Sequence, residues 1–75
     1  MPELRAVSGQ QAIKALERLG FKQVRQRGTH VVLKKSTPTG NIGCVVPLHK
    51  ELKIGTLRGI LKLAKVEPEE FLENL

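Results

Sequence analysis

Apolar residues recur at helical spacing in two stretches of the chain, and helix-boundary signals flank the first of them. Ser8 and Gln11 match a capping box, and Gly20 is placed to end a helix in the left-handed conformation. The apolar positions between these signals are Ala12, Ile13, Ala15, Leu16 and Leu19. The apolar stripe of the second stretch is Leu57, Ile60, Leu61 and Ala64. These patterns predict helices over about residues 9–19 and 54–65.

Three short segments between the two helices favour β-strands. Residues 21–27 place Phe and Val among polar side chains, and residues 29–35 are rich in β-branched side chains, which strands prefer. A third strand is expected over residues 42–46, where Pro47 closes it. Residues 36–41 contain Pro and Gly at positions typical of a turn. The short connections predict an antiparallel meander.

The order of elements predicts an α+β fold with a single domain over residues 1–75. We expect an α-β-β-β-α arrangement in which two helices cover one face of a three-stranded antiparallel sheet. Pro68, followed by two glutamates, indicates the first turn of a short C-terminal helix. The residues expected to dock that helix are Phe71, Leu72 and Leu75. The other face of the sheet should then be open to solvent.

Strand alternation assigns side chains to the two faces of the predicted sheet. In the strand at 29–35, the inward residues should be Val31 and Leu33, and the outward residues His30, Val32 and Lys34. In the preceding strand, we expect Val24 to point toward the core and Arg25 and Arg27 to lie on or near the open face. His30 would then stand on an exposed surface among cations, next to a bend at Gly28.

Charge along the chain is strongly asymmetric. Residues 1–66 hold 13 basic side chains against three glutamates, a net of +10, and four glutamates fall in the last nine residues. Such a basic body attracts polyanions, most commonly nucleic acid, although a general solubilising charge is the alternative. The chain has no aspartate, and its glutamates are scattered or confined to the tail, so we expect no metal site and no cofactor.

The composition also bears on redox state and location. Cys44 is the only cysteine, so it cannot form an internal disulfide, and its apolar neighbours indicate a small buried hydrophobe. The first residues lack the apolar core of a signal peptide, and no apolar run approaches the length of a membrane span. We therefore expect a cytoplasmic protein without membrane association.

The histidine at position 30 is the best candidate for chemistry. Cleaving RNA without a metal requires a base, an acid and positive charge near the reacting phosphate, and imidazole can serve as either acid or base near neutral pH. The alternative is a bystander histidine on a strand. His49 is a candidate acid partner or a loop residue without a task, and Thr29 either orients His30, binds phosphate, or is an ordinary strand threonine.

The few aromatic residues narrow the kind of nucleic acid that the protein would bind. Phe21 and Phe71 are the only aromatics, and both are expected in the core. Proteins that stack single-stranded bases on aromatic rings are therefore disfavoured, and double-stranded or structured RNA is favoured. The second helix adds a basic stripe, formed by Arg58, Lys62 and Lys65.

Four short motifs together resemble one protein family. They are Leu-Gly-Phe at 19–21, Val-Arg-Gln-Arg-Gly-Thr-His at 24–30, Val-Val-Pro at 45–47 and Ile-Gly-Thr-Leu-Arg-Gly-Ile-Leu at 54–61. In this order and spacing the chain resembles the HicA-type mRNA interferase toxins. The resemblance runs from about residue 8 to residue 75. It implies a fold similar to double-stranded-RNA-binding domains, an endoribonuclease that cleaves mRNA, and a HicB-type antitoxin that covers the active surface.

The family's catalytic histidine follows a Gly-Ser or Gly-Thr pair, which corresponds here to His30. Many members carry a second histidine directly afterwards, where this chain has Val31, and Thr29 replaces the commoner serine. The residues expected to bind RNA are Arg25, Arg27, Gly28, Thr29, Lys34 and Arg58. Two other functions are open at this point, a non-catalytic RNA-binding module and a domain whose basic face serves only a protein partner.

Overall fold

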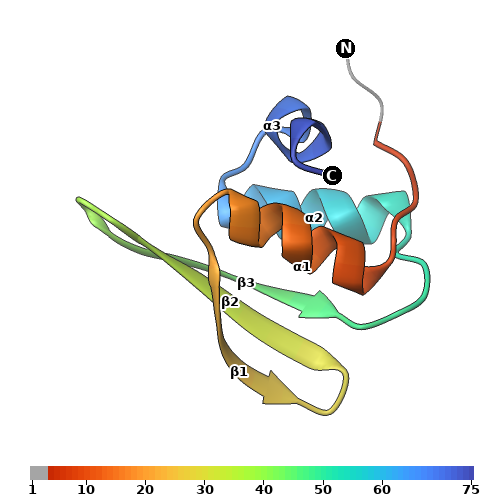
Figure 1. Ribbon diagram of the computed structural model, residues 1–75, viewed down its shortest axis with the longest axis horizontal. Helices are drawn as coiled ribbons and strands as arrows, with labels where there is room; N and C mark the ends of the chain where they lie inside the picture. The colour runs from red at the N-terminus through yellow and green to blue at the C-terminus, as the bar shows by residue number, and fades with distance from the viewer. Residues whose placement is uncertain (1–3) are drawn as a thin grey trace.

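The computed structural model describes residues 4–75 and contains six helices and strands (Figure 1). We expected no signal peptide at the start of the chain, and the first three residues of that segment lie outside the described residues. The elements are α1 (Gly9–Arg18), β1 (Lys22–Arg27), β2 (His30–Thr37), β3 (Gly40–Pro47), α2 (Ile54–Ala64) and α3 (Pro68–Glu73). The predicted α+β fold, with its α-β-β-β-α order and short last helix, is confirmed.

The first helix begins as its sequence predicts. The Ser8 hydroxyl accepts a hydrogen bond from the Gln11 N–H at 3.1 Å, and the Gln11 side chain accepts one from the Ser8 N–H at 2.9 Å. This reciprocal capping box satisfies two backbone donors that a helix N-terminus leaves without partners. At the other end Gly20 has a φ of 103°, a conformation that glycine adopts without steric cost.

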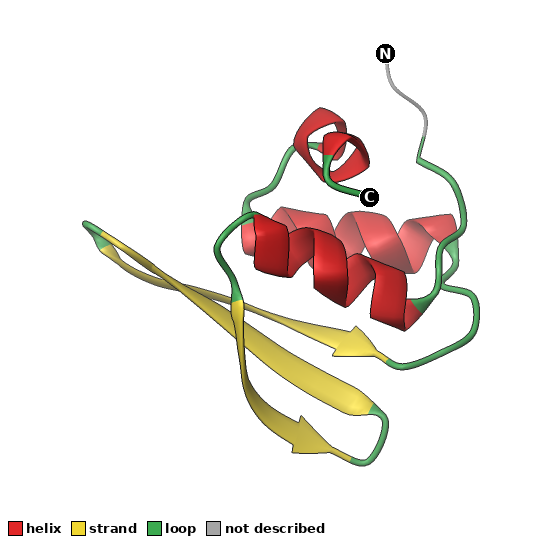
Figure 2. Ribbon diagram, in the orientation of Figure 1, coloured by secondary structure: helices red, strands yellow, loops and turns green. Residues whose placement is uncertain are grey.

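The three strands form an antiparallel sheet in the order β1-β2-β3, and α1 and α2 lie side by side over one of its faces (Figures 1 and 2). The second hairpin is tighter than the sequence indicated. Ser36 pairs with Asn41 and Thr37 with Gly40, so only Pro38 and Thr39 form the turn. The hydroxyl of Thr37 donates to the Gly40 carbonyl at 2.7 Å, which stabilises this longer pairing.

The core lies between the sheet and the helices. β2 and β3 contribute the inward side chains Val31, Leu33, Cys44 and Val46, and all four are buried. The largest fully buried side chains opposite them include Leu16, Leu57 and Phe71 from the helices and Leu52 from the loop before α2. Phe71 thus docks α3 as expected, and Arg18 ties α1 to the same region by donating to the Asn74 carbonyl at 2.6 Å. Hydrophobic burial at this single interface supplies most of the stabilisation available to so small a domain.

Strand β1 contains a β-bulge at Val24. Gln23 pairs with Leu33 and Arg25 pairs with Val32, so Val24 has no partner in the register. The expectation that Val24 points into the core is wrong, because 53% of its surface is exposed. A bulge inserts one extra residue into a strand and changes the face occupied by the residues beyond it. The expectation assumed that Val24 alternates with Arg25 and Arg27, and the bulge interrupts that alternation between Val24 and Arg25.

Burial of Cys44 predicts low reactivity of its thiol. Desolvation raises the pKa of Cys44 to about 11, from an ordinary value of 9.0, and the thiolate is the reactive form. At pH 8 the folded protein should react with iodoacetamide about 100-fold more slowly than the protein unfolded in guanidinium chloride. Mass spectrometry of the labelled fraction over time measures both rates. Equal rates would contradict the buried position.

Candidate functional site

His30 is the first residue of β2 and lies on the face of the sheet that the helices leave uncovered. Its neighbour Val31 is 1% exposed beneath the helices, whereas the His30 side chain is exposed. The register places His30 directly opposite Arg27 on one side and Pro47 on the other. Directly opposed residues in an antiparallel pair have Cβ atoms about 5 Å apart and share a face of the sheet. An imidazole and a guanidinium therefore stand side by side on an open surface.

The turn that joins Arg27 to His30 consists of two residues, Gly28 and Thr29. Gly28 has a φ of 57°, and a positive φ at the first turn position is typical of a type II′ hairpin. Two hydrogen bonds hold this turn from outside it. The Gln26 side chain donates to the Gly28 carbonyl at 3.0 Å, and the Leu48 N–H donates to the Thr29 carbonyl at 2.6 Å. The backbone beside His30 is thus fixed in position.

Further cations continue along the same face. Arg25 lies opposite Val32, and Lys34 lies opposite Lys22, so these side chains follow His30 and Arg27 across the strands. Like charges directly opposite each other in a sheet destabilise it, and an anion bound between Lys22 and Lys34 would relieve the repulsion. The structure therefore brings four of the predicted site residues onto one surface, His30, Arg25, Arg27 and Lys34, with Gly28 and Thr29 at its end.

The β-bulge is the reason that both arginines reach this surface. Gln23 faces the helices because it pairs with the buried Leu33. Regular alternation from Gln23 would turn residues 25 and 27 toward the helices as well. The extra residue at Val24 reverses this, so that Arg25 and Arg27 share the face of Val32 and His30. Lys22, which sequence reasoning did not single out, joins the surface through the same register.

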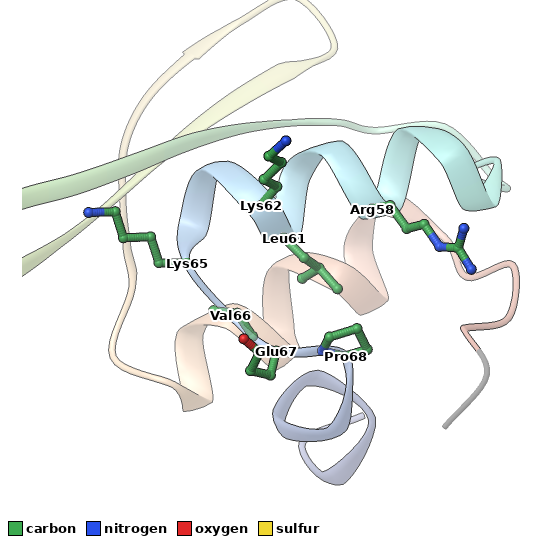
Figure 3. Close-up of a pocket in the computed structure, with 7 residues that line it drawn as sticks. All are labelled: Arg58, Leu61, Lys62, Lys65, Val66, Glu67 and Pro68. Carbon is green, nitrogen blue, oxygen red and sulfur yellow. The ribbon is translucent and has the colours of Figure 1, made fainter. Parts of the chain in front are cut away.

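Arg58 lies elsewhere. It belongs to α2, on the helix side of the sheet, where it lines a groove of about 420 Å³ between α2 and the segment entering α3 (Figure 3). Lys62, Lys65 and Glu67 line the same groove. The structure thus separates Arg58 from the other predicted RNA-binding residues. A stripe on a helix does not reveal which side of a distant sheet it will occupy, so the sequence could not show this separation.

His49 is exposed in the loop after β3, two residues beyond the Pro47 that pairs with His30. Its carbonyl accepts a hydrogen bond from the Gly9 N–H at 2.9 Å. A side chain at Gly9 would collide with the Pro47 carbonyl oxygen, so glycine permits α1 to lie against this loop. The imidazole lines a hollow of about 260 Å³ with Ser8, Gln10, Leu48 and Lys50. The end of the sheet that carries His30 is therefore held by the start of α1.

Two features that would indicate other functions are missing from the described part of the chain. Across residues 4–75 no three His, Cys, Asp or Glu side chains are grouped closely enough to hold a metal ion. In the same range none of the helices has both the length and the apolar character needed to cross a bilayer. The chemistry that the arrangement offers is that of an exposed imidazole beside fixed positive charge, which suits proton transfer at a phosphate.

Comparison with known families agrees with the motifs. The family model described as the HicA toxin of bacterial toxin–antitoxin systems matches residues 9–66, which run from the start of α1 to just beyond α2. A search of curated proteins gave no match. The matched segment includes the whole sheet, the Gly28–Thr29 turn and His30.

Substitution of Gly9 tests how closely α1 packs against the loop that carries His49. Gly9→Ala should lower the free energy of unfolding by about 1–3 kcal/mol, because the added methyl group meets the Pro47 carbonyl. Gly59→Ala is the matched control, since a Cβ there meets open space within α2 and should raise the same quantity by up to about 1 kcal/mol. Urea denaturation measures both. Equal stability of the two variants would rule out the close contact.

Proposed function

We propose that this protein, which belongs to the HicA toxin family of bacterial toxin–antitoxin systems, is a metal-independent endoribonuclease that cleaves mRNA with His30. The observation that carries the proposal is the position of His30, exposed on an open sheet face and directly opposite Arg27. Family membership supports the toxin role, and the imidazole–guanidinium pair supports the reaction. Such an enzyme would act in the cytoplasm, where mRNA is translated.

The proposed reaction begins at the ribose next to the scissile phosphate. His30 takes the proton of the 2′-hydroxyl, and the 2′-oxygen attacks the adjacent phosphorus. The phosphorane that forms carries extra negative charge, which Arg27 stabilises from the opposite strand. The bond to the 5′-oxygen then breaks and leaves a 2′,3′-cyclic phosphate and a 5′-hydroxyl. The leaving oxygen takes a proton from His49 or from water, and a His49→Ala variant distinguishes these sources.

The remaining cations of the sheet would hold the RNA backbone. Arg25 and Lys34 lie on the same face as His30, and Lys22 stands opposite Lys34. Phosphate contacts of this kind fix the register of a nucleic acid without reading its sequence. Gly28 and Thr29 sit at the end of the surface, where a turn without a bulky side chain at position 28 leaves room for the backbone to approach. These residues are proposed to bind RNA.

The same face is suited to the antitoxin. Membership in a toxin–antitoxin family implies an antitoxin partner. At the centre of the open face Val32 pairs with Val45, which is 42% exposed, and Arg25 lies opposite Val32 on the other side. We expect a HicB-type partner to cover the valine pair with apolar side chains and to offer acidic side chains to the cations of β1 and β2. Such a partner would exclude RNA from His30.

A non-catalytic RNA-binding module is the second candidate. Two observations favour it. The position after His30 is occupied by Val31, which is buried in the core. The groove beside α2 adds three cations on the side of the sheet away from His30. A pure binder would retain its affinity for RNA when His30 is replaced and would yield no cleavage products. It would also lose affinity steeply as the salt concentration rises.

Induced expression and digestion of RNA in vitro separate these candidates. The wild-type protein should arrest bacterial growth and cleave RNA equally well with and without a chelator. His30→Ala should lower the cleavage rate by at least about 100-fold, the usual loss when a general base is removed. Arg27→Gln should lower it by about 10-fold to 100-fold through lost charge stabilisation.

Lys50→Ala is the matched control, because it removes an exposed cation from the loop after β3 and should leave the rate within about twofold. Circular dichroism verifies that each variant is folded. Cleavage by His30→Ala at the wild-type rate, or RNA binding without any cleavage by the wild type, would refute the nuclease.

A further inference from the structure

A groove of about 370 Å³ lies between α1 and β1, on the side of the sheet opposite His30. Its apolar lining comes from three different elements, Ile13 of α1, Val31 of β2 and Leu48 of the loop after β3. Three glutamines, Gln10, Gln23 and Gln26, bring amide groups to the same groove. The volume falls within the range of about 300–1,000 Å³ that is typical of sites for small organic ligands. An apolar surface with a few converging amides is the usual composition of such a site.

The β-bulge directs two of these glutamines into the groove. Gln23 pairs with Leu33 and Gln26 pairs with Val31, so both share the face of buried core residues. β1 is one of the two edge strands of the sheet, and all six of its residues are exposed. Polar side chains on the core-facing side of an exposed edge strand are not needed for packing. Gln23 and Gln26 instead lie beside the apolar lining of the groove.

The amides of these glutamines are partly oriented already. The Gln26 side chain uses one N–H to bond the Gly28 carbonyl at 3.0 Å, which leaves its second N–H and its oxygen for a ligand. The Gln23 amide lies 3.5 Å from the Glu17 carboxylate, which also lines the groove. Lys14 lines the groove as well. The groove therefore offers amide donors, amide acceptors, one ammonium donor and one carboxylate acceptor. A ligand that matches it must present both donors and acceptors on a flat apolar body.

The groove and the proposed cleavage site adjoin each other along the chain. Gln26 precedes Arg27, and Val31 follows His30, so each residue of the open-face pair has a neighbour that lines the groove. Leu48, on the floor, bonds the Thr29 carbonyl at the tip of the turn. An RNA strand that passes around the Gly28–Thr29 end of the sheet would have its phosphate at His30 and an adjacent base at the groove.

We propose that this groove binds one unstacked nucleobase of the RNA, with a preference for adenine. The proposal rests on the proposed function only in taking RNA as the ligand. An amide presents a donor beside an acceptor, and adenine offers the complementary pair at N6 and N7, with the second N6 proton available to Glu17. Phe21 and Phe71 are both buried, so recognition here depends on hydrogen bonds and aliphatic contact. The groove would thus supply a base preference next to the scissile phosphate.

Binding of short RNAs tests this preference without cleavage. The full-length His30→Ala protein is titrated with fluorescent octamers of adenosine, uridine and 7-deazaadenosine at one salt concentration. The adenosine octamer should bind about tenfold more tightly than either of the others, the discrimination that one two-point amide–base contact provides. Adding Gln23→Ala should abolish the preference and leave the weaker, salt-dependent binding. Adding Asn41→Ala, an exposed amide in the far hairpin, should leave the preference unchanged.

The side-chain amide resonances locate the bound base. In an NMR titration with the adenosine octamer, the signals of Gln10, Gln23 and Gln26 should shift, while that of Asn41 should not.

Equal affinity for all three octamers, or a preference that survives Gln23→Ala, overturns the proposal even if the wild type cleaves RNA. Adenosine-selective binding that depends on Gln23, in a wild type that cleaves nothing, would refute the nuclease and uphold the groove. Groove signals that shift only with the antitoxin would assign the groove to the protein partner instead and overturn the proposal.

Discussion

A single unpaired residue in β1 decides what the two sides of the sheet can do. Because Val24 is bulged, Arg25 and Arg27 share the open face with His30, and Gln23 and Gln26 face the helices. Without the extra residue, Arg25 and Arg27 would face the helices together with Gln23, and Gln26 would lie on the open face. The bulge therefore gathers positive charge beside the imidazole on one side and amides beside an apolar floor on the other. Both proposed sites depend on this one irregularity.

The end of the sheet that carries His30 is held from several directions. The Leu48 N–H bonds the Thr29 carbonyl, and the Gly9 N–H bonds the His49 carbonyl, so the first hairpin, the loop after β3 and the start of α1 form one connected unit. The opposite end of β2 and β3 extends beyond the helices as a long hairpin (Figure 1). A catalytic group works best on a rigid element, because small displacements of the reacting groups reduce the rate sharply. The chain thus places its candidate histidine at an end of the sheet that hydrogen bonds connect to the loop after β3 and to the start of α1.

Much of this arrangement could be predicted from local patterns. The capping box at Ser8 and Gln11 fixed the start of α1, and alternation from Val31 to Leu33 correctly placed His30 and Lys34 on the uncovered face. Those signals are local, since they depend on residues three apart or on strict alternation within one strand. The expected order of elements follows from them directly.

The bulge and what depends on it could not be predicted in this way. A bulged valine has no distinctive residue type, and its presence becomes evident only from the pairing of β1 with β2. The positions of Lys22, Gln23 and Gln26 depend on that register. The same holds for the packing of helices on the sheet. The sequence placed Arg58 on α2, but it could not show that Arg58 lies on the side of the sheet away from the open face. The pairing of strands and the packing of helices on the sheet decide which residues share a site. A single sequence contains few signals for either.

The most direct test of the account is a structure of the protein bound to a short RNA that carries a 2′-O-methyl group at every ribose, so that cleavage is blocked. The account predicts one phosphate within hydrogen-bonding distance of both His30 and Arg27, on the face of the sheet away from the helices. RNA bound only along the α2 groove that contains Arg58, with His30 in contact with solvent alone, would contradict it.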